Sequence, residues 1–358
     1  MGRRNGRGGT AGPPLRPPPG RRRSSAPQAA HATTEAPLRE WLISEGGAFH
    51  PSLVLVDAAP SGCRGVVASA ALPLSELEAF GPLLVVPAHL HLENGLALAQ
   101  LQRWMGRDAA DAAAAALSSA VLVAMALAHE AALGATSRWA PYTALLSPAP
   151  PSPWLLPRRE LRHAAAEALA GAPRGSCGDA QASGSGSGSS GGGDGGGGSG
   201  SGSSGGGVAA WVSAAEAYRA EVDAEVARAL ELLAGAAAAA DAAAVAGQGG
   251  GWLSRELLTW AIGHVESRSL GTSGSSGLVP AVDLLNHDPS TRPPMLQLDD
   301  SDRLVVTVLP MRDGDAAPLA AADELCIDYG ARAPLEGWLK FGFVSAEWWR
   351  DDGGGELR

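Results

Sequence analysis

The sequence has few of the residues that stabilise small secreted or metal-binding folds. It holds 3 Cys, 4 Phe, 3 Tyr and a single lysine, Lys340, among 358 residues, and aromatic residues make up 5% of the chain. Cys63, Cys177 and Cys326 stand far apart, which gives no sign of a disulfide framework or of a zinc site and fits a reducing compartment. Much of the apolar content is alanine, so we expect a core built on Leu, Val and the ten Trp.

Positive charge is scarce outside the N-terminus. Residues 1–34 contain seven Arg and no acidic residue, and the net charge is −10, so the rest of the chain carries −10 − 7 = −17. This balance gives no indication of a nucleic-acid-binding surface. Residues 1–37 are expected to be a disordered tail or an organelle transit peptide, and both interpretations stay open. The transit peptide would place the protein in a plastid, and otherwise we expect a cytoplasmic or nuclear location.

Long apolar runs and the best-known catalytic motifs are also missing. The most apolar stretch, residues 112–133, is mostly Ala and reaches His129-Glu130, so it is marginal for a membrane span and better explained as a buried helix. No GxGxxG sequence opens a helix, and GxSxG and HExxH do not occur. A dinucleotide-binding domain, a serine hydrolase of this type and a zinc protease therefore have no support.

The chain alternates between β-rich and helical segments. Residues 52–93 have short apolar runs separated by turn residues, which predicts strands, and residues 96–135 have helical periodicity. A short helix is expected over 158–170. Residues 171–207 are rich in Gly and Ser and predict a flexible loop. Because loop closure entropy grows slowly with length, this loop interrupts a helical insertion without dividing the chain into domains.

The region after the loop returns to strands. An amphipathic helix is expected over 209–234 and another over 254–270 with Ser254 as its N-cap. Residues 271–277 are expected to be a loop. Strands are expected in "LVPAVDLL", "RLVVTVLP" and "DELCIDYG". Neither β-rich half is self-sufficient, so we expect them to pair into one α+β structure.

Four polar residues near the predicted strand and helix ends are candidates for chemistry. Asn286 and His287 follow an apolar run, and Tyr329 precedes Gly330 at the end of another. Each also has an ordinary interpretation: a turn before Asp-Pro for the first two, and a packed ring with a solvated hydroxyl for Tyr329. Arg268, near a helix C-terminus, either complements the helix dipole or binds a carboxylate.

In their order along the chain these segments resemble the SET-domain protein methyltransferases, in the Rubisco large-subunit methyltransferase-like branch. The resemblance rests on "GCRGVVASAALPLSELEAFGPLLVVP", "SRWAPYTALL", "LLTWAIGHVESRSL", "LVPAVDLLNH" and "DELCIDYG…WLKFGFV". It implies a β-rich SET fold split by a helical insertion. The implied parts are a first SET half at 38–95, the insertion at 96–260, a second half at 261–346 and a tail at 347–358.

The resemblance also implies an activity and roles for named residues. The expected activity is S-adenosylmethionine-dependent methyl transfer to a protein amine, most simply lysine, with no nucleic acid, membrane or metal involved. Tyr329 would be catalytic. The cofactor would lie against Gly62, Cys63, Gly65, Arg268, Asp283, Asn286, His287 and Tyr329. The substrate channel would be lined by Trp338, Phe341 and Phe343.

Three departures from the family pattern keep alternatives open. The family's Tyr-Gly-Phe is Phe341-Gly342-Phe343 here, and "ARAPLEG" stands where Ser-Asn is common. The helical substrate-binding domain that follows the SET domain in this branch is missing from the sequence. These departures leave room for a catalytically inactive SET-like binding module. A histidine acceptor is a further alternative to lysine.

Overall fold

The computed structural model describes residues 36–73, 75–77, 81–171, 204–239, 254–272, 275–289, 294–307 and 319–349. The expected N-terminal tail and Gly/Ser loop lie outside these residues except at their edges. Helix α1 (Ala36–Ser44) begins just inside the expected tail, and helix α8 (Ser204–Ala239) begins just inside the expected loop.

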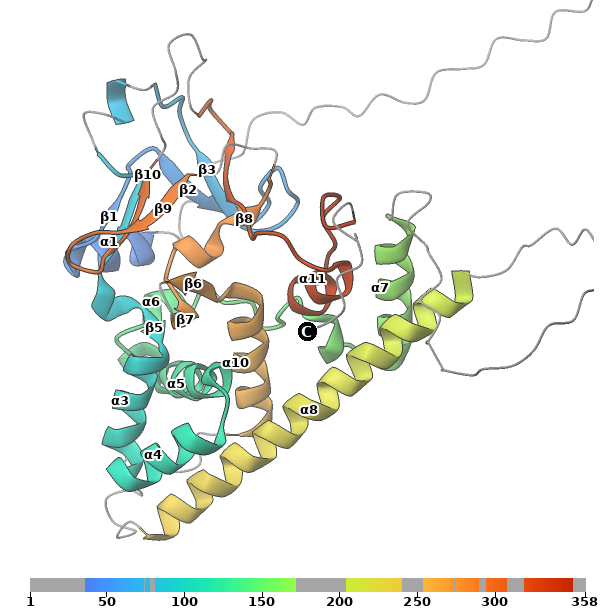
Figure 1. Cartoon of the computed structure of the whole chain (residues 1–358). Coiled ribbons are helices and arrows are strands. Elements are labelled where there is room, and N and C mark those ends of the chain that lie inside the picture. The colour runs from blue at the N-terminus through green and yellow to red at the C-terminus, as the bar shows by residue number, and fades with distance from the viewer. Residues whose placement is uncertain are drawn as a thin grey trace, which may run out of the picture.

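Strands from the two ends of the chain pair into three small sheets (Figure 1). The first contains β1 (Ala48–Phe49), β4 (Leu84–Val86), β10 (Leu304–Thr307) and β9 (Met295–Leu298) in that order. The second contains β2 (Leu53–Val56), β3 (Gly65–Ala68), β11 (Glu324–Ile327) and β8 (Asn286–His287). The third contains β5 (Leu92–Glu93), β7 (Ser275–Leu278) and β6 (Leu270–Thr272). In each sheet, a strand from the N-terminal part of the chain pairs with one from the C-terminal part: β4 with β10, β3 with β11 and β5 with β7. The expected α+β structure is therefore confirmed.

Most ladders are antiparallel, but β8 and β11 run parallel, with Cys326 opposite Asn286 and Ile327 opposite His287. The C-terminal ends of two parallel strands meet at the same edge of a sheet. The residues after Ile327 therefore lie beside Asn286 and His287, although they are about forty positions away in sequence. This pairing brings two of the sequence-predicted segments to one place.

Most of the helices lie away from the first two sheets, whereas α1 lies beside β1 (Figure 1). Besides α1 and α8, they are α3 (Asn94–Met105), α4 (Arg107–Ala116), α5 (Ser119–Leu133), α6 (Ala140–Thr143), α7 (Arg158–Ala170), α10 (Arg255–Arg268) and α11 (Pro334–Phe341). Helix α5 lies at the centre, packed against α3 and α10. By length and composition, residues 119–136 would suffice to cross a membrane. However, every residue from Val121 to Ala128 is buried, which confirms a buried helix in this part of residues 112–133. The start of that range belongs to the end of α4, where Ala115 and Ala116 are exposed.

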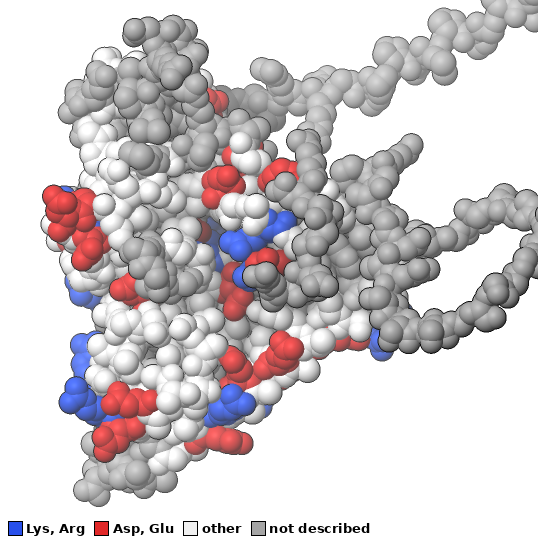
Figure 2. Space-filling model, viewed as in Figure 1, with Lys and Arg blue, Asp and Glu red and all other residues white. Residues whose placement is uncertain are grey.

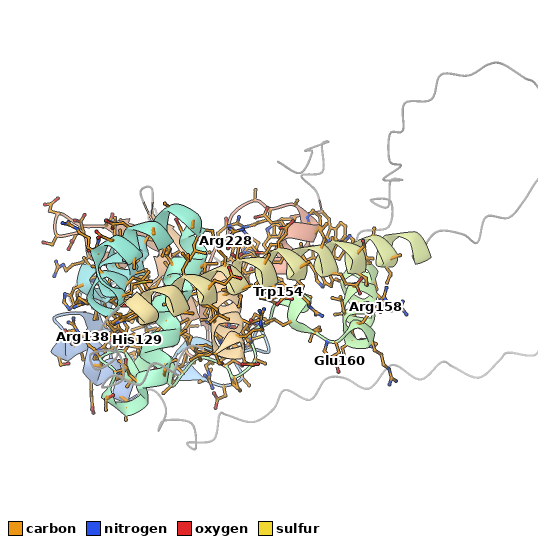
Figure 3. The ribbon with its side chains drawn as sticks, turned by 90° about the horizontal axis from the view of Figure 1, so that it is seen from below. His129, Arg138, Trp154, Arg158, Glu160 and Arg228 are labelled. Atoms are coloured by element: carbon orange, nitrogen blue, oxygen red, sulfur yellow. The ribbon has the colours of Figure 1, made fainter. Side chains whose placement is uncertain are left out.

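Helix α8 runs along the edge of this helical layer (Figure 3). Arg219 donates hydrogen bonds to the carbonyls of Trp154 and Leu156, and Arg158 pairs with Glu216 at 2.9 Å. Arg228 donates to the carbonyl of Ala116 at the C-terminal end of α4, where carbonyl groups have no partner within their own helix. These contacts fix α8, which follows the Gly/Ser stretch, to segments that precede it.

Three expectations about local structure are corrected. The apolar run "LVPAVDLL" is not a strand: residues 282–284 form a 3₁₀ turn, entered through Ala281 with φ of 71°. Residues 271–277 are not a loop, because β6 and β7 form a hairpin there. Residues 347–349 are not tail, since Trp348 and Trp349 are buried at 1% and 9% exposure. The expected N-cap is confirmed, with the Ser254 hydroxyl accepting the backbone N–H of Leu257 at 3.1 Å.

Candidate functional site

A cavity of about 520 Å³ lies where the end of α10, the 3₁₀ turn and the segment after β11 meet. Four of the residues singled out from the sequence line it: Arg268, Asp283, Tyr329 and Phe341. Its volume falls within the range of small-molecule sites. Acidic and basic side chains lie next to each other on this face, between β8 and α11 (Figure 2). The cavity therefore combines an apolar body with charged groups of both signs.

Arg268 is the last residue of α10, and its guanidinium is held at two atoms. Nη1 donates to the carbonyl oxygen of Asp283 at 2.9 Å, and Nε donates to Nδ1 of His264 at 3.4 Å. These two bonds orient the guanidinium plane, and the residue lines the cavity. A guanidinium fixed in this way is suited to a planar carboxylate, which it binds through two parallel N–H groups.

Asp283 sits in the 3₁₀ turn with its side chain buried. Tyr142 donates its hydroxyl hydrogen to Oδ2, whereas Oδ1 has no partner among the described residues. Burial raises the pKa of Asp283 to about 7, against the lowering effects of Arg268 and Tyr142. A buried carboxyl oxygen without a partner is costly, and Asp283 carries this cost beside the cavity that it lines.

Tyr329 follows β11 and is brought to the cavity by the parallel pairing with β8. Its hydroxyl donates to the carbonyl oxygen of Leu285 at 2.9 Å. Its ring packs against Phe341, with centroids 4.8 Å apart. Burial raises the pKa of Tyr329 to about 12. The phenol is therefore protonated at neutral pH, so it is able to orient a ligand by hydrogen bonding and is not a general base.

The glycine turn and Asn286 form a separate polar cluster. The amide nitrogen of Asn286 donates to the Arg64 carbonyl at 2.9 Å, to Ser61 Oγ at 3.1 Å and to Glu324 Oε1 at 2.6 Å. Glu324 also accepts from the backbone N–H and hydroxyl of Ser61. At Gly65 a Cβ atom would stand 2.5 Å from Glu324 Oε1 and 2.7 Å from Asn286 Nδ2, which explains the glycine. The groups of this cluster satisfy one another.

The structure brings Gly65 and Asn286 together, as the resemblance implies, but neither lines the 520 Å³ cavity. Gly62 has φ of 89° with open space around it, and Cys63 is an exposed free thiol. Both belong to the turn beside Asn286. The sequence-predicted cofactor residues thus fall into two neighbouring groups, of which only the group around Arg268 faces the cavity.

His287 joins the two groups through the backbone of Tyr329. Its Nδ1 accepts the Tyr329 N–H at 3.1 Å, so the hydrogen is on Nε2, which lies 2.6 Å from Glu347 Oε1. The ring stacks against Phe343 and Trp348 with centroids 6.1 Å and 5.1 Å away. His287 therefore positions the main chain at Tyr329 and does not itself line the cavity.

Trp338 occupies a different place from the one the resemblance implies. It is fully buried, its ring lies 5.0 Å from that of Trp211 on α8, and it does not line the cavity. Phe343 is 39% exposed and lies beyond Phe341, 6.0 Å from it. Phe341 is the only one of the three expected channel residues that reaches the cavity. Trp338 is a core residue that fixes α11 against α8.

Several residues of the site were not singled out from the sequence. They are Tyr142, His264, Glu324 and Glu347. Tyr142 lies in "SRWAPYTALL", where the local signal is a pair of aromatic residues, Trp139 and Tyr142, with a proline between them. Glu324 begins "ELCIDYG", and an acidic residue at the start of a buried strand is unusual enough to notice. His264 and Glu347 have no comparable local signal.

Comparison with solved structures identifies the fold. A crystal structure of the SET domain of LSMT bound to lysine and AdoHcy matches with a TM-score of 0.56 at 15% sequence identity, over 87% of this chain. Structures of Rubisco LSMT bound to sinefungin and monomethyllysine, and to AdoMet, match with TM-scores of 0.55 and 0.54 at 16% and 15% identity, each over 87% of this chain. The chain spans 56–57% of the length of these proteins. No protein-family model and no curated protein matches the sequence. The chain has the SET-domain fold of LSMT.

Proposed function

We propose that this chain, with its SET-domain fold, is an S-adenosylmethionine-dependent protein methyltransferase that acts on lysine. The observation that carries the proposal is one cavity lined by Arg268, Asp283 and Tyr329, at the point where the two halves of the fold meet. No other reaction class supported by the sequence needs a fixed guanidinium, a buried carboxyl group and a protonated phenol together in one apolar cavity. The solved structures of similar fold contain AdoMet, AdoHcy or sinefungin.

The residues present fit this cofactor. The fixed guanidinium of Arg268 suits the methionyl carboxylate. The unpartnered Oδ1 of Asp283 is a ready acceptor for a hydroxyl or an ammonium group. The rings of Tyr329 and Phe341 present π-faces that attract a sulfonium or ammonium cation. When bound, the cofactor supplies an electrophilic methyl group, which is the demanding part of the chemistry.

The protein then has to orient a neutral amine and exclude water. Lysine has an unperturbed pKa of about 10.4 and is mostly protonated at neutral pH. An apolar wall such as Phe341 and a nearby sulfonium both lower that pKa, by desolvation and by like charge. The Tyr329 hydroxyl, held against the Leu285 carbonyl, is placed to hydrogen-bond the entering amine. Alignment of the amine with the S–CH₃ bond supplies most of the rate enhancement.

The proposal is tested by calorimetry with AdoMet, followed by transfer of a labelled methyl group to proteins of a cell extract. The expected result is binding by the wild type, strongly weakened binding by Arg268→Ala, and a labelled protein whose modified residue is lysine by mass spectrometry. Absence of AdoMet binding in a folded wild-type sample would exclude the methyltransferase. A labelled histidine in place of lysine would correct the acceptor.

A binding module without catalysis is the second candidate, and one observation favours it. The Asn286 amide, which the resemblance assigns to the cofactor, is already bonded to Arg64, Ser61 and Glu324. A protein that has lost cofactor binding has no need to keep that amide available. A folded wild type that binds no AdoMet, or one that binds AdoMet without transfer to any protein in the extract, would support this candidate over the enzyme.

A further inference from the structure

We propose that His264 is a positioning residue that fixes the guanidinium of Arg268 for ligand binding. The proposal rests on the proposed function, because it assigns a task to Arg268 in that site. Trp260, His264 and Arg268 stand four residues apart on α10, and therefore lie along one face of the helix. The first two contact the connector after α6, and the third lines the cavity.

The two ring nitrogens of His264 have different partners, which fixes the tautomer. Nε2 lies 2.8 Å from the carbonyl oxygen of Ser147, an acceptor only, so Nε2 carries the hydrogen. Nδ1 lies 3.4 Å from Nε of Arg268, a donor only, so Nδ1 has a free lone pair. Both contacts are made by a single neutral tautomer. Burial, followed by the charge of Arg268, lowers the pKa of His264 to about 4, which keeps the ring neutral near pH 7.

The acceptor on His264 matters because solvent does not easily replace it. His264 is fully buried, so water does not reach its ring directly, and removing Nδ1 leaves the Arg268 Nε–H without this acceptor. Among the described residues, the other anchor of the guanidinium is the bond from Nη1 to the Asp283 carbonyl. One bond defines a direction but leaves the plane free to turn about it, whereas two bonds fix the plane. Recognition of a carboxylate by two parallel N–H groups depends on that plane.

The same connector braces other parts of the site. Tyr142 donates to the carboxylate of Asp283, and Arg64, next to Gly65 in the glycine turn, donates to the carbonyl of Leu145. Together with the bond from His264 to Ser147, these contacts tie a six-residue stretch, 142–147, to three site elements. The stretch belongs to the "SRWAPYTALLS" segment of the helical insertion. The insertion thereby orients the cavity residues without lining the cavity itself.

The chain offers matched variants that separate the two contacts of His264. His264→Gln keeps a donor near the place of Nε2 but loses the acceptor for Arg268. His264→Asn keeps an amide oxygen near the place of Nδ1 but loses the contact to Ser147. His264→Phe loses both. Trp260→Phe removes the second hydrogen bond to the Ser147 carbonyl, 2.9 Å in the wild type, and leaves Arg268 untouched.

The first measurement is the dissociation constant for AdoMet, with sinefungin as a second probe, on full-length variants shown to be folded by thermal unfolding. His264→Gln and His264→Phe are expected to bind about tenfold more weakly, as for the loss of one charged hydrogen bond. His264→Asn and Trp260→Phe are expected to stay within about threefold of the wild type, because Arg268 keeps its acceptor in both. If Trp260→Phe weakens binding as much as His264→Gln, or His264→Asn as much as His264→Phe, the effect comes from the connector and the proposal is wrong.

The second measurement needs no cofactor. The Nε–H proton of Arg268, assigned by its loss in Arg268→Lys, is expected to give a solvent-protected NMR signal in the wild type and in His264→Asn, and to lose protection in His264→Gln. A wild type that fails to bind AdoMet but shows this pattern overturns the proposed function and keeps the positioning role. Equal protection in His264→Gln and the wild type overturns the positioning role, whatever the cofactor does.

Discussion

Two polar groups lie side by side in this fold and differ in how their hydrogen bonds are completed. In the first group, the side-chain amide of Asn286 donates to the Ser61 hydroxyl, the Arg64 carbonyl and the Glu324 carboxylate, and these groups satisfy one another. Around Arg268, the polar atoms face a cavity of about 520 Å³, and Oδ1 of Asp283 has no partner among the described residues. Buried polar groups are normally satisfied. The first group therefore stabilises the junction of the two halves, whereas the second leaves a buried carboxyl oxygen without a partner beside a cavity.

The largest effect is expected on the cavity side, from Tyr329→Phe. This change removes one hydroxyl and keeps the ring against Phe341, so cofactor affinity should change by less than about threefold while the rate of methyl transfer falls by about 10²–10³-fold. The measurement is single-turnover transfer of labelled methyl at saturating AdoMet. Tyr218→Phe on α8, which does not line this cavity, is the matched control and should keep the wild-type rate. Equal loss in both variants would remove Tyr329 from the mechanism.

The next effect concerns the pH dependence of stability and comes from Asp283. Its pKa is about 7 in the folded protein, against 3.8 for the free side chain, because burial favours the neutral acid. Between these values the unfolded chain binds fewer protons, so this group's contribution to stability is complete below pH 4 and is lost as the pH rises to 7. The limiting slope is about 1.4 kcal/mol per pH unit.

Asp283→Asn tests this directly, because asparagine cannot ionise and its oxygen still accepts from Tyr142. Urea unfolding is measured at pH 4, 5.5 and 7. As the pH rises over this range, the unfolding free energy of the variant should increase relative to that of the wild type by a few kcal/mol. His264 has the opposite sign: its pKa is lowered to about 4, so its contribution is lost as the pH falls below 6.5. That contribution is present in both proteins and cancels in the difference. Parallel pH curves would show that Asp283 ionises normally.

In the hydrogen-bonded cluster around Asn286, Gly65→Ala is expected to destabilise the fold by about 1–3 kcal/mol. The added Cβ would stand 2.5 Å from Glu324 Oε1, and that carboxylate is unable to retreat without breaking its bonds to Ser61 and Asn286. Urea unfolding gives the free energy. Gly95→Ala, at the start of α3 where nothing lies within 4 Å, is the control and should be neutral or slightly stabilising. A neutral Gly65→Ala would mean that the cluster is loose.

The sequence predicts the secondary structure around the two polar groups better than it predicts what each residue contacts. The order of strands and helices, the pairing of the two halves and the Ser254 cap follow from local patterns of apolar and turn residues. The apolar run before Asn286 was assigned to the wrong structure, because periodicity in a short apolar stretch does not separate a strand from a 3₁₀ turn. Trp348 and Trp349 fall in the expected tail because the resemblance implies a second SET half that ends at residue 346, and their burial depends on tertiary packing.

The contacts that shape the cavity are set by tertiary structure. Tyr142 meets Asp283 across 141 positions, and His264 meets Ser147 across 117. Nothing near Tyr142 or His264 in sequence marks such a partner, because the pairing depends on how α6 and α10 pack around α5. Arg268 and Tyr329 are candidates because they stand at predicted helix and strand ends, and Asp283 is implied by the resemblance alone. Their supporting residues were found only from the structure.

The smallest effect is expected at Ala281, which introduces the 3₁₀ turn of Asp283. Its φ of 71° and ψ of −40° lie near the region of the γ-turn, which is strained for a residue with a Cβ. Ala281→Gly relieves that strain and increases the entropy of the unfolded chain, two opposing terms of about 1 kcal/mol each. The net change in unfolding free energy should stay within about 0.5 kcal/mol. Ala261→Gly, equally buried but inside α10, has no strain to relieve and should lose about 1 kcal/mol. Equal losses in the two variants would show that Ala281 is unstrained, and that the turn carrying Asp283 is held by ordinary packing.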